Sequence, residues 1–158
     1  MSALRSSVPA VLLLVGAAAM VAAQGRSTTF HVTLPGGPFP GTYDVASDNC
    51  DAGLHKPGSW NVLWEADGGG KGKLTAVMVG IDPKPFYGSG ITAVVEFGGD
   101  EHKVLYEIQK AVPTVTDRGK TATLVFSGKA RVADYNTGNF EDGGQVEIKI
   151  ECGKVARY

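Results

Sequence analysis

Apolar and polar residues alternate along most of the chain after residue 27, and this alternation predicts β-strands. Near the C-terminus Val146, Ile148, Ile150 and Cys152 share one face of an extended segment, while glutamates and a lysine occupy the other face. Outside the first 23 residues, no window of ten or more residues has helical spacing. Because successive side chains of a strand point to opposite faces, the pattern predicts an all-β domain with one face in the core.

Eight segments carry this strand pattern, and clusters of Gly, Pro, Asp and Asn separate them. The spacing of short strands and turn clusters favours an antiparallel β-sandwich of about seven to nine strands. Gly128, inside one long segment, predicts a bulge or a bend between sheets. The expected strands are Thr28–Leu34, Gly41–Ala46, Trp60–Ala66, Leu74–Ile81, Ile91–Phe97, Val104–Ala111, Thr121–Val132 and Gln145–Cys152.

The first 23 residues have the pattern of a cleaved signal peptide. Arg5 precedes an apolar run that ends in the small residues Ala22 and Ala23, which is the order of regions that signal peptidase recognises. The run is too short and too interrupted for a membrane span. We therefore expect a secreted or periplasmic protein whose single domain covers residues 24–158.

Two cysteines follow the leader, and an oxidising compartment favours their pairing. Cys50 follows the second expected strand, and Cys152 ends the last one. We expect one structural disulfide that ties the two ends of the domain together. Because no cysteine directly follows the leader, we expect no lipid anchor.

The charge of the mature chain is nearly balanced. Removal of Arg5 with the leader leaves 14 basic residues (15 − 1) against 16 acidic ones, a net charge of −2. Both signs are interspersed, so no basic stripe is available to neutralise the phosphates of a nucleic acid. The expected partner is a protein or a glycan outside the cytoplasm.

Residue types that carry catalysis do not form a recognisable motif. His31, His55 and His102 lack the spacing of metal ligands. The carboxylates fall in turns or on strand positions expected to face outward, where solvated carboxylates are common. We therefore expect no catalytic residues, no metal and no cofactor. The carboxylates considered are Glu65, Glu96, Asp100, Glu101, Glu107, Glu141 and Asp142.

The segment from Asp134 to Asp142 resembles the opening of a calcium-binding loop. Asp134 and Asn136 alternate as oxygen ligands, but Gly138 takes the fifth position and Gln145 the twelfth, where a bidentate glutamate is usual. Turns rich in Asp and Asn are also common without an ion. A structural calcium and an ordinary long hairpin loop both remain open.

Aromatic residues provide the remaining candidates for ligand contact. Phe39, Phe86, Tyr87, Tyr135 and Phe140 fall in expected loops, whereas the two tryptophans share a strand face. Exposed rings stack on sugars or anchor a partner, but rings on one strand face also build a core. The candidate contact residues are Trp60, Trp64, Phe86, Tyr87, Tyr135 and Phe140.

Two C-terminal segments carry a resemblance to a known family. Residues 119–130 (GKTATLVFSGKA) and 145–152 (QVEIKIEC) resemble the C-terminal half of the mycobacterial nineteen-kilodalton lipoprotein antigen family. The resemblance implies a secreted, disulfide-closed β-domain without catalytic residues. This chain differs from that family because it lacks the lipid-attachment cysteine, and its tryptophan-containing middle has no counterpart there.

Together these observations predict an exported, non-catalytic β-sandwich domain that binds a partner or has a structural role at the cell envelope. The alternative is a carbohydrate-binding module, with or without a structural calcium.

Overall fold

The computed structural model describes residues 27–55, 57–81, 91–100, 102–109, 111 and 113–158. The predicted signal peptide, residues 1–23, lies outside the described residues, as do Phe86 and Tyr87. The described part forms strands and their connections, which confirms the prediction of an all-β fold. Its strands are β1 (Thr28–Leu34), β2 (Gly41–Ser47), β3 (Asp51–Ala52), β4 (Trp60–Glu65), β5 (Leu74–Ile81), β6 (Ile91–Phe97), β7 (Val104–Gln109), β8 (Thr114–Asp117), β9 (Ala122–Asp134), β10 (Asn139–Cys152) and β11 (Ala156–Arg157).

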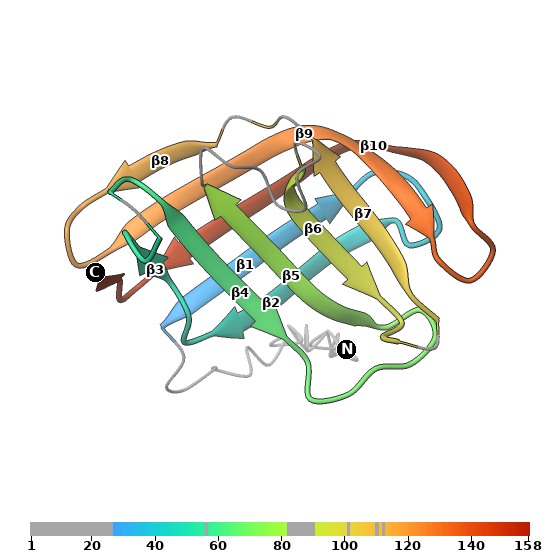
Figure 1. Cartoon of the computed structure of the whole chain (residues 1–158), viewed down its shortest axis with the longest axis horizontal. Helices are drawn as coiled ribbons and strands as arrows, with labels where there is room; N and C mark the ends of the chain where they lie inside the picture. Colours follow the sequence, from blue (N-terminus) through green and yellow to red (C-terminus); the bar gives the residue numbers. More distant parts are fainter. Residues whose placement is uncertain (1–26, 56, 82–90, 101, 110, 112) are drawn as a thin grey trace, which may run out of the picture.

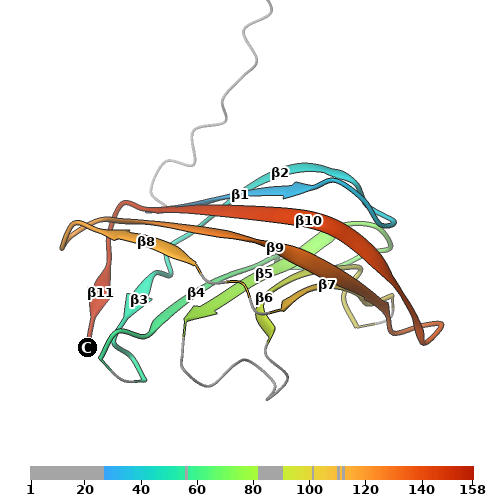
Figure 2. The ribbon, with the colours of Figure 1, turned by 90° about the horizontal axis from the view of Figure 1, so that it is seen from above.

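All eleven strands belong to one curled sheet. Its order is β11-β3-β4-β5-β6-β7-β9-β10-β1-β2. The remaining strand, β8, pairs with a different part of β9 from the part that pairs with β7. Only the short β11–β3 pair is parallel among the described pairings. Figure 1 shows β4 to β7 crossing in front of β1, β2 and β10, and Figure 2 shows the same two layers from above.

The prediction of a sandwich, which has two separate sheets, is not confirmed, because hydrogen bonding continues through the strands that join the two layers. These strands are β9 and β10, of 13 and 14 residues. One part of β9 pairs with β7 and another part pairs with β8, while β10 runs along its other side. The two long strands thus connect the layers into one sheet, whereas the layers of a sandwich are separate sheets.

The bounds of the predicted strands agree well with the structure, except at β10. That strand begins at Asn139 instead of Gln145. A bulge between Asp142 and Gly144 lets the strand continue through two glycines. Gly128, by contrast, pairs regularly with Val146. A Cβ at Gly128 would lie 2.8 Å from a methyl group of Ile108, so close packing, not a bulge, requires this glycine.

The core lies between the two layers, on the concave face of the curled sheet. Trp60, Val62 and Trp64 pair in register with Ile81, Val79 and Val77 of β5. Trp60 and Val62 are buried, and Trp64 is partly buried against the core. The predicted alternation of β4 is therefore confirmed. The largest fully buried side chains are Tyr106, Phe30, Phe97, Phe126, Leu34, Ile108, Leu124, Ile148, Ile150, Val32, Val62 and Val77.

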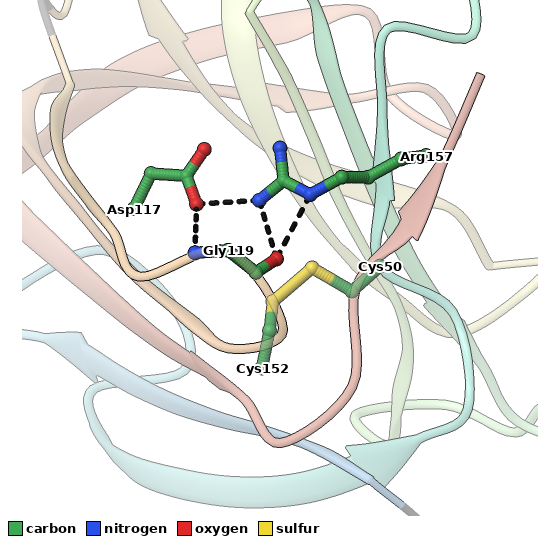
Figure 3. A network of polar contacts seen from close by, with 5 residues as sticks. All are labelled: Cys50, Asp117, Gly119, Cys152 and Arg157. Atoms are coloured by element: carbon green, nitrogen blue, oxygen red, sulfur yellow. Dashed lines mark hydrogen bonds and ion pairs between the residues drawn. A yellow bond between two sulfur atoms is a disulfide. The ribbon is translucent and has the colours of Figure 1, made fainter.

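The predicted disulfide is present and closes one end of the molecule (Figure 3). Cys50 and Cys152 are 102 residues apart in the chain, and their Cα atoms are 6.2 Å apart. Beyond Cys152 the tail pairs with β3. The Arg157 guanidinium donates to Asp117 Oδ1 at 2.5 Å and to the carbonyl of Gly119 at 2.6 and 2.8 Å. The disulfide and this arginine together fix the tail across the β8–β9 hairpin.

Candidate functional site

The end of the sheet opposite the disulfide is built from turns and contains a cleft. The β1–β2, β4–β5, β6–β7 and β9–β10 turns gather there, at the right of Figure 1. The cleft has a volume of about 490 Å³. We call it the mouth cleft, and its lining residues are Pro38, Phe39, Lys71, Gly72, His102, Val104, Val132, Asp134, Asn136, Thr137, Asn139 and Glu141.

The β1–β2 turn forms one side of the mouth cleft, and two buried contacts fix it. The Tyr106 hydroxyl accepts a hydrogen bond from the backbone N–H of Phe39 at 2.8 Å and donates to the carbonyl of Gly36 at 3.1 Å. The ring of Phe39 stacks on Phe97 with centroids 4.6 Å apart. Burial raises the pKa of Tyr106, so its hydroxyl keeps the proton that it donates. The turn is therefore preorganised.

Gly37 is required for this arrangement. Its φ is 75°, in the left-handed region that favours glycine. A Cβ there would also lie 2.6 Å from the Tyr106 hydroxyl oxygen. Any larger residue would push the turn away from the tyrosine that holds it.

The opposite side of the mouth cleft is the concave face of β7, β9 and β10. Asp134 of β9 pairs with Val104 of β7 and with Asn139 of β10. Val132 pairs in the same way with Tyr106 and Glu141. Because residues directly opposite each other in a sheet share a face, the apolar and polar side chains alternate across one wall.

The carboxylate of Asp134 is held by its own hairpin turn. Its Oδ1 atom accepts hydrogen bonds from the Asn136 backbone N–H at 2.8 Å, from the Asn136 side-chain amide at 3.1 Å and from the Thr137 backbone N–H at 3.3 Å. These bonds, chiefly the one from the Asn136 backbone, lower the pKa of Asp134. The group is therefore ionised at neutral pH and fixed in position.

The calcium alternative for this segment finds no ligand set in the described residues. Asp134 is engaged by the turn, and Asp142 lies on the other face of β10, where it pairs with Lys129 at 2.7 Å. No group of three or more His, Cys, Asp or Glu side chains in the described ranges is placed to hold a metal ion. The segment is a tight hairpin, since β9 ends at Asp134 and β10 begins at Asn139.

The aromatic residues expected to contact a ligand lie elsewhere in the structure. Trp60 is buried, and the Arg157 guanidinium lies 5.9 Å from its ring centroid. Tyr135 and Phe140 are 61% and 63% exposed, and Arg131 lies 4.7 Å from the Phe140 centroid. None of these described residues, nor Trp64, lines the mouth cleft. Its aromatic residue is Phe39, which the sequence places in a loop without further distinction.

A second, larger hollow of about 630 Å³ lies on the convex face of the sheet. Glu65 and Glu96 both pair with Ala76, on neighbouring strands at either side. Two strand spacings separate their backbones by about 10 Å. Glu96 lies 3.5 Å from the ammonium of Lys103 and accepts a hydrogen bond from Thr75 at 3.3 Å. One of the two carboxylates is thus already engaged by neighbouring side chains.

Glu107 corrects the expectation that the carboxylates lie in solvent. Its side chain is only 5% exposed. Val94 of β6 and Arg131 of β9 lie opposite it on either side, and Arg131 Nε donates to its carboxylate at 2.9 Å. Alternation identifies the face on which Glu107 lies, but it does not reveal that neighbours shield this part of the convex face.

Comparison with known protein families, with curated proteins and with solved structures gave no match. Within the described ranges, no helix has the length and apolar character needed to cross a membrane. The disulfide fits a location outside the cytoplasm.

Proposed function

We propose that this chain is an exported, non-catalytic binding domain and that its ligand occupies the mouth cleft. The observation that carries the proposal is a preorganised cleft of about 490 Å³ whose lining combines apolar and polar side chains. Ligand sites commonly measure about 300–1,000 Å³, and the mouths of β-barrels are one place where they occur. In this proposal the leader directs export, and the two facing halves of the sheet take the place of the two layers of a sandwich.

The protonation state of Asp134 favours a role in binding over one in general acid catalysis. A general acid needs a pKa close to the working pH. The hydrogen bonds to Asp134 instead lower its pKa and keep it ionised. The group is suited to accept hydrogen bonds from a ligand, not to transfer a proton to it.

The rigidity of the cleft also supports binding. Tyr106 and Phe97 fix the side that carries Phe39, and the Asp134 turn fixes the opposite side. A preorganised site loses less conformational entropy when a ligand binds, so more of the contact energy remains as affinity. The disulfide and the Arg157 clamp hold the other end of the sheet (Figure 3).

A pair of matched variants tests the proposal. Asn139→Trp places a large ring in the mouth cleft, whereas Glu147→Trp places the same ring at an exposed position of the same strand, away from the cleft. Each protein is incubated with a defined mixture of oligosaccharides, amines and fatty acids, and the bound compounds are detected by native mass spectrometry. The proposal predicts that the wild type and Glu147→Trp retain one compound that Asn139→Trp loses. Equal retention by both variants, or no retention by the wild type, contradicts it.

A further inference from the structure

We propose that the ligand of the mouth cleft is a neutral saccharide, held with its hydroxyl groups on the β9–β10 wall and its apolar surface toward Phe39. This inference rests on the proposed function, because it names the ligand class of the same cleft. Three features of the lining support this ligand class: its acceptors, its donors and its apolar side chains.

The acceptors are two carboxylates that have no cation partner among the described side chains. Asp134 and Glu141 lie diagonally across the β9–β10 pair, where Cα atoms are about 7–8 Å apart. The Asp134 carboxylate is engaged by its turn and also interacts with the Thr137 side chain, so Glu141 offers the freer acceptor of the two. Hydrogen bonds to charged acceptors are stronger than those to neutral ones, so these carboxylates favour a ligand rich in O–H or N–H donors.

Donors line the same cleft. Asn139 lies opposite Asp134 in the register of the sheet and offers an amide N–H, and Lys71 of the β4–β5 turn offers an ammonium. A ligand group that only donates would satisfy the carboxylates but not these residues. A hydroxyl group both donates and accepts, so a polyhydroxylated ligand matches the whole polar side.

Charge argues against an anionic ligand. The carboxylates of Asp134 and Glu141 repel the head group of a fatty acid or a phosphate ester. The ammonium of Lys71 offsets one of these two charges and so weakens the attraction of the cleft for a cation, a class that the spermidine probe tests directly. A neutral ligand meets no charge repulsion and still forms charge-assisted hydrogen bonds.

The apolar side completes the match. Phe39 and Val104 line the cleft, and Val132 lies directly opposite Glu141 in the register of the sheet. A pyranose ring has a face of C–H groups that packs on such a surface, in the way that aromatic rings combine apolar contact with polar neighbours in binding sites. The cleft volume of about 490 Å³ accommodates a few sugar units.

Isothermal titration calorimetry on the purified protein tests this inference with four neutral oligosaccharides: the hexaoses of β-glucan, chitin, mannan and xylan. Spermidine and laurate serve as cationic and anionic probes. We expect one hexaose to bind with a Kd of about 5 mM or below, and the titration uses millimolar hexaose so that even such weak binding is detectable. Glu141→Gln should weaken that binding at least fivefold by removing one charged acceptor.

Asp142→Asn is the matched control, because it removes a neighbouring charge on the opposite face of the same strand. It also keeps the oxygen that accepts the Gly144 N–H. This variant should bind within twofold of the wild type. Equal weakening by both variants overturns the inference, because a general charge effect would then explain the loss.

The probes also separate this inference from the proposed function. If spermidine or laurate binds and Asn139→Trp abolishes it, while no hexaose binds, the mouth cleft is a binding site and the saccharide inference is wrong. If none of the six probes binds the wild type, both the inference and the proposed function are contradicted.

Discussion

The disulfide should account for a large part of the stability of this domain. Cys50 and Cys152 enclose a loop of about 100 residues, with a sequence separation of 102. In the chain-entropy model, closing a loop of that length in the unfolded state stabilises the folded state by about 4.7 kcal/mol at 25 °C. The double variant C50A/C152A removes this constraint without leaving a free thiol.

The same magnitude predicts a large shift in melting temperature. Unfolding entropy is about 2.1 cal/mol/K per residue, which gives roughly 0.27 kcal/mol/K for a domain of about 130 residues. A loss of about 4.7 kcal/mol therefore lowers the midpoint by roughly 17 °C. Differential scanning calorimetry of the wild type and C50A/C152A measures this shift. Reduced and alkylated wild-type protein serves as an independent control.

A small effect would refute this reasoning. If C50A/C152A melts within about 4 °C of the wild type, the lost stability is near 1 kcal/mol, far below the value for a loop of this length. The tail would then be fixed by the Arg157 clamp and by pairing of β11 with β3, which do not depend on the bridge (Figure 3).

Three further predictions concern the fixed turn and the clamp. Gly37→Ala should destabilise the protein more than Gly138→Ala in urea unfolding, because both glycines have left-handed φ but only a Cβ at Gly37 meets the Tyr106 hydroxyl; equal losses would contradict the clash. Tyr106→Phe should cost about 1–3 kcal/mol by leaving a half-buried N–H and carbonyl without their partner, and an unchanged urea midpoint would exclude those bonds. The hydrogen bond from Arg157 lowers the pKa of Asp117, so the folded state binds fewer protons near pH 4 than the unfolded state. The resulting stability is present above the usual pKa of 3.8 and is lost as pH falls through the lower folded value. Melting curves between pH 2 and 6 should therefore show a weaker acid dependence for Asp117→Asn, and identical profiles would contradict the contribution of the clamp.

Period-2 alternation predicts most strands, because a half-buried strand places apolar residues on its core face and polar residues on its exposed face. The early start of β10 was missed because Glu141, Asp142 and two glycines are typical of loops. β3 and β11 have two residues each, too few to show alternation, and β11 forms where the C-terminal tail pairs with β3. The choice between one curled sheet and two sheets depends on which distant strands pair, and alternation contains no information about that.

The candidate site was harder to predict than the fold. Sequence identifies Phe39 and Phe140 equally as loop aromatics, yet Phe39 stacks on Phe97 at the mouth cleft and Phe140 lies 63% exposed. Asp134 was noticed as a calcium ligand, but its cleft neighbours Val104 and Asn139 come from other strands. A site assembled across a sheet becomes visible only with the register of its strands.

A map of ligand-induced amide shifts shows whether the ligand site lies in the mouth cleft. The purified ¹⁵N-labelled protein is titrated with the hexaose that binds in calorimetry, and each amide signal is followed by two-dimensional NMR. The proposed function predicts shifts concentrated at Phe39, Lys71, Asp134, Asn139 and Glu141, while signals of the convex face near Glu65 and Glu96 stay in place. Shifts confined to the convex face, with the signals of the mouth cleft unchanged, would contradict it.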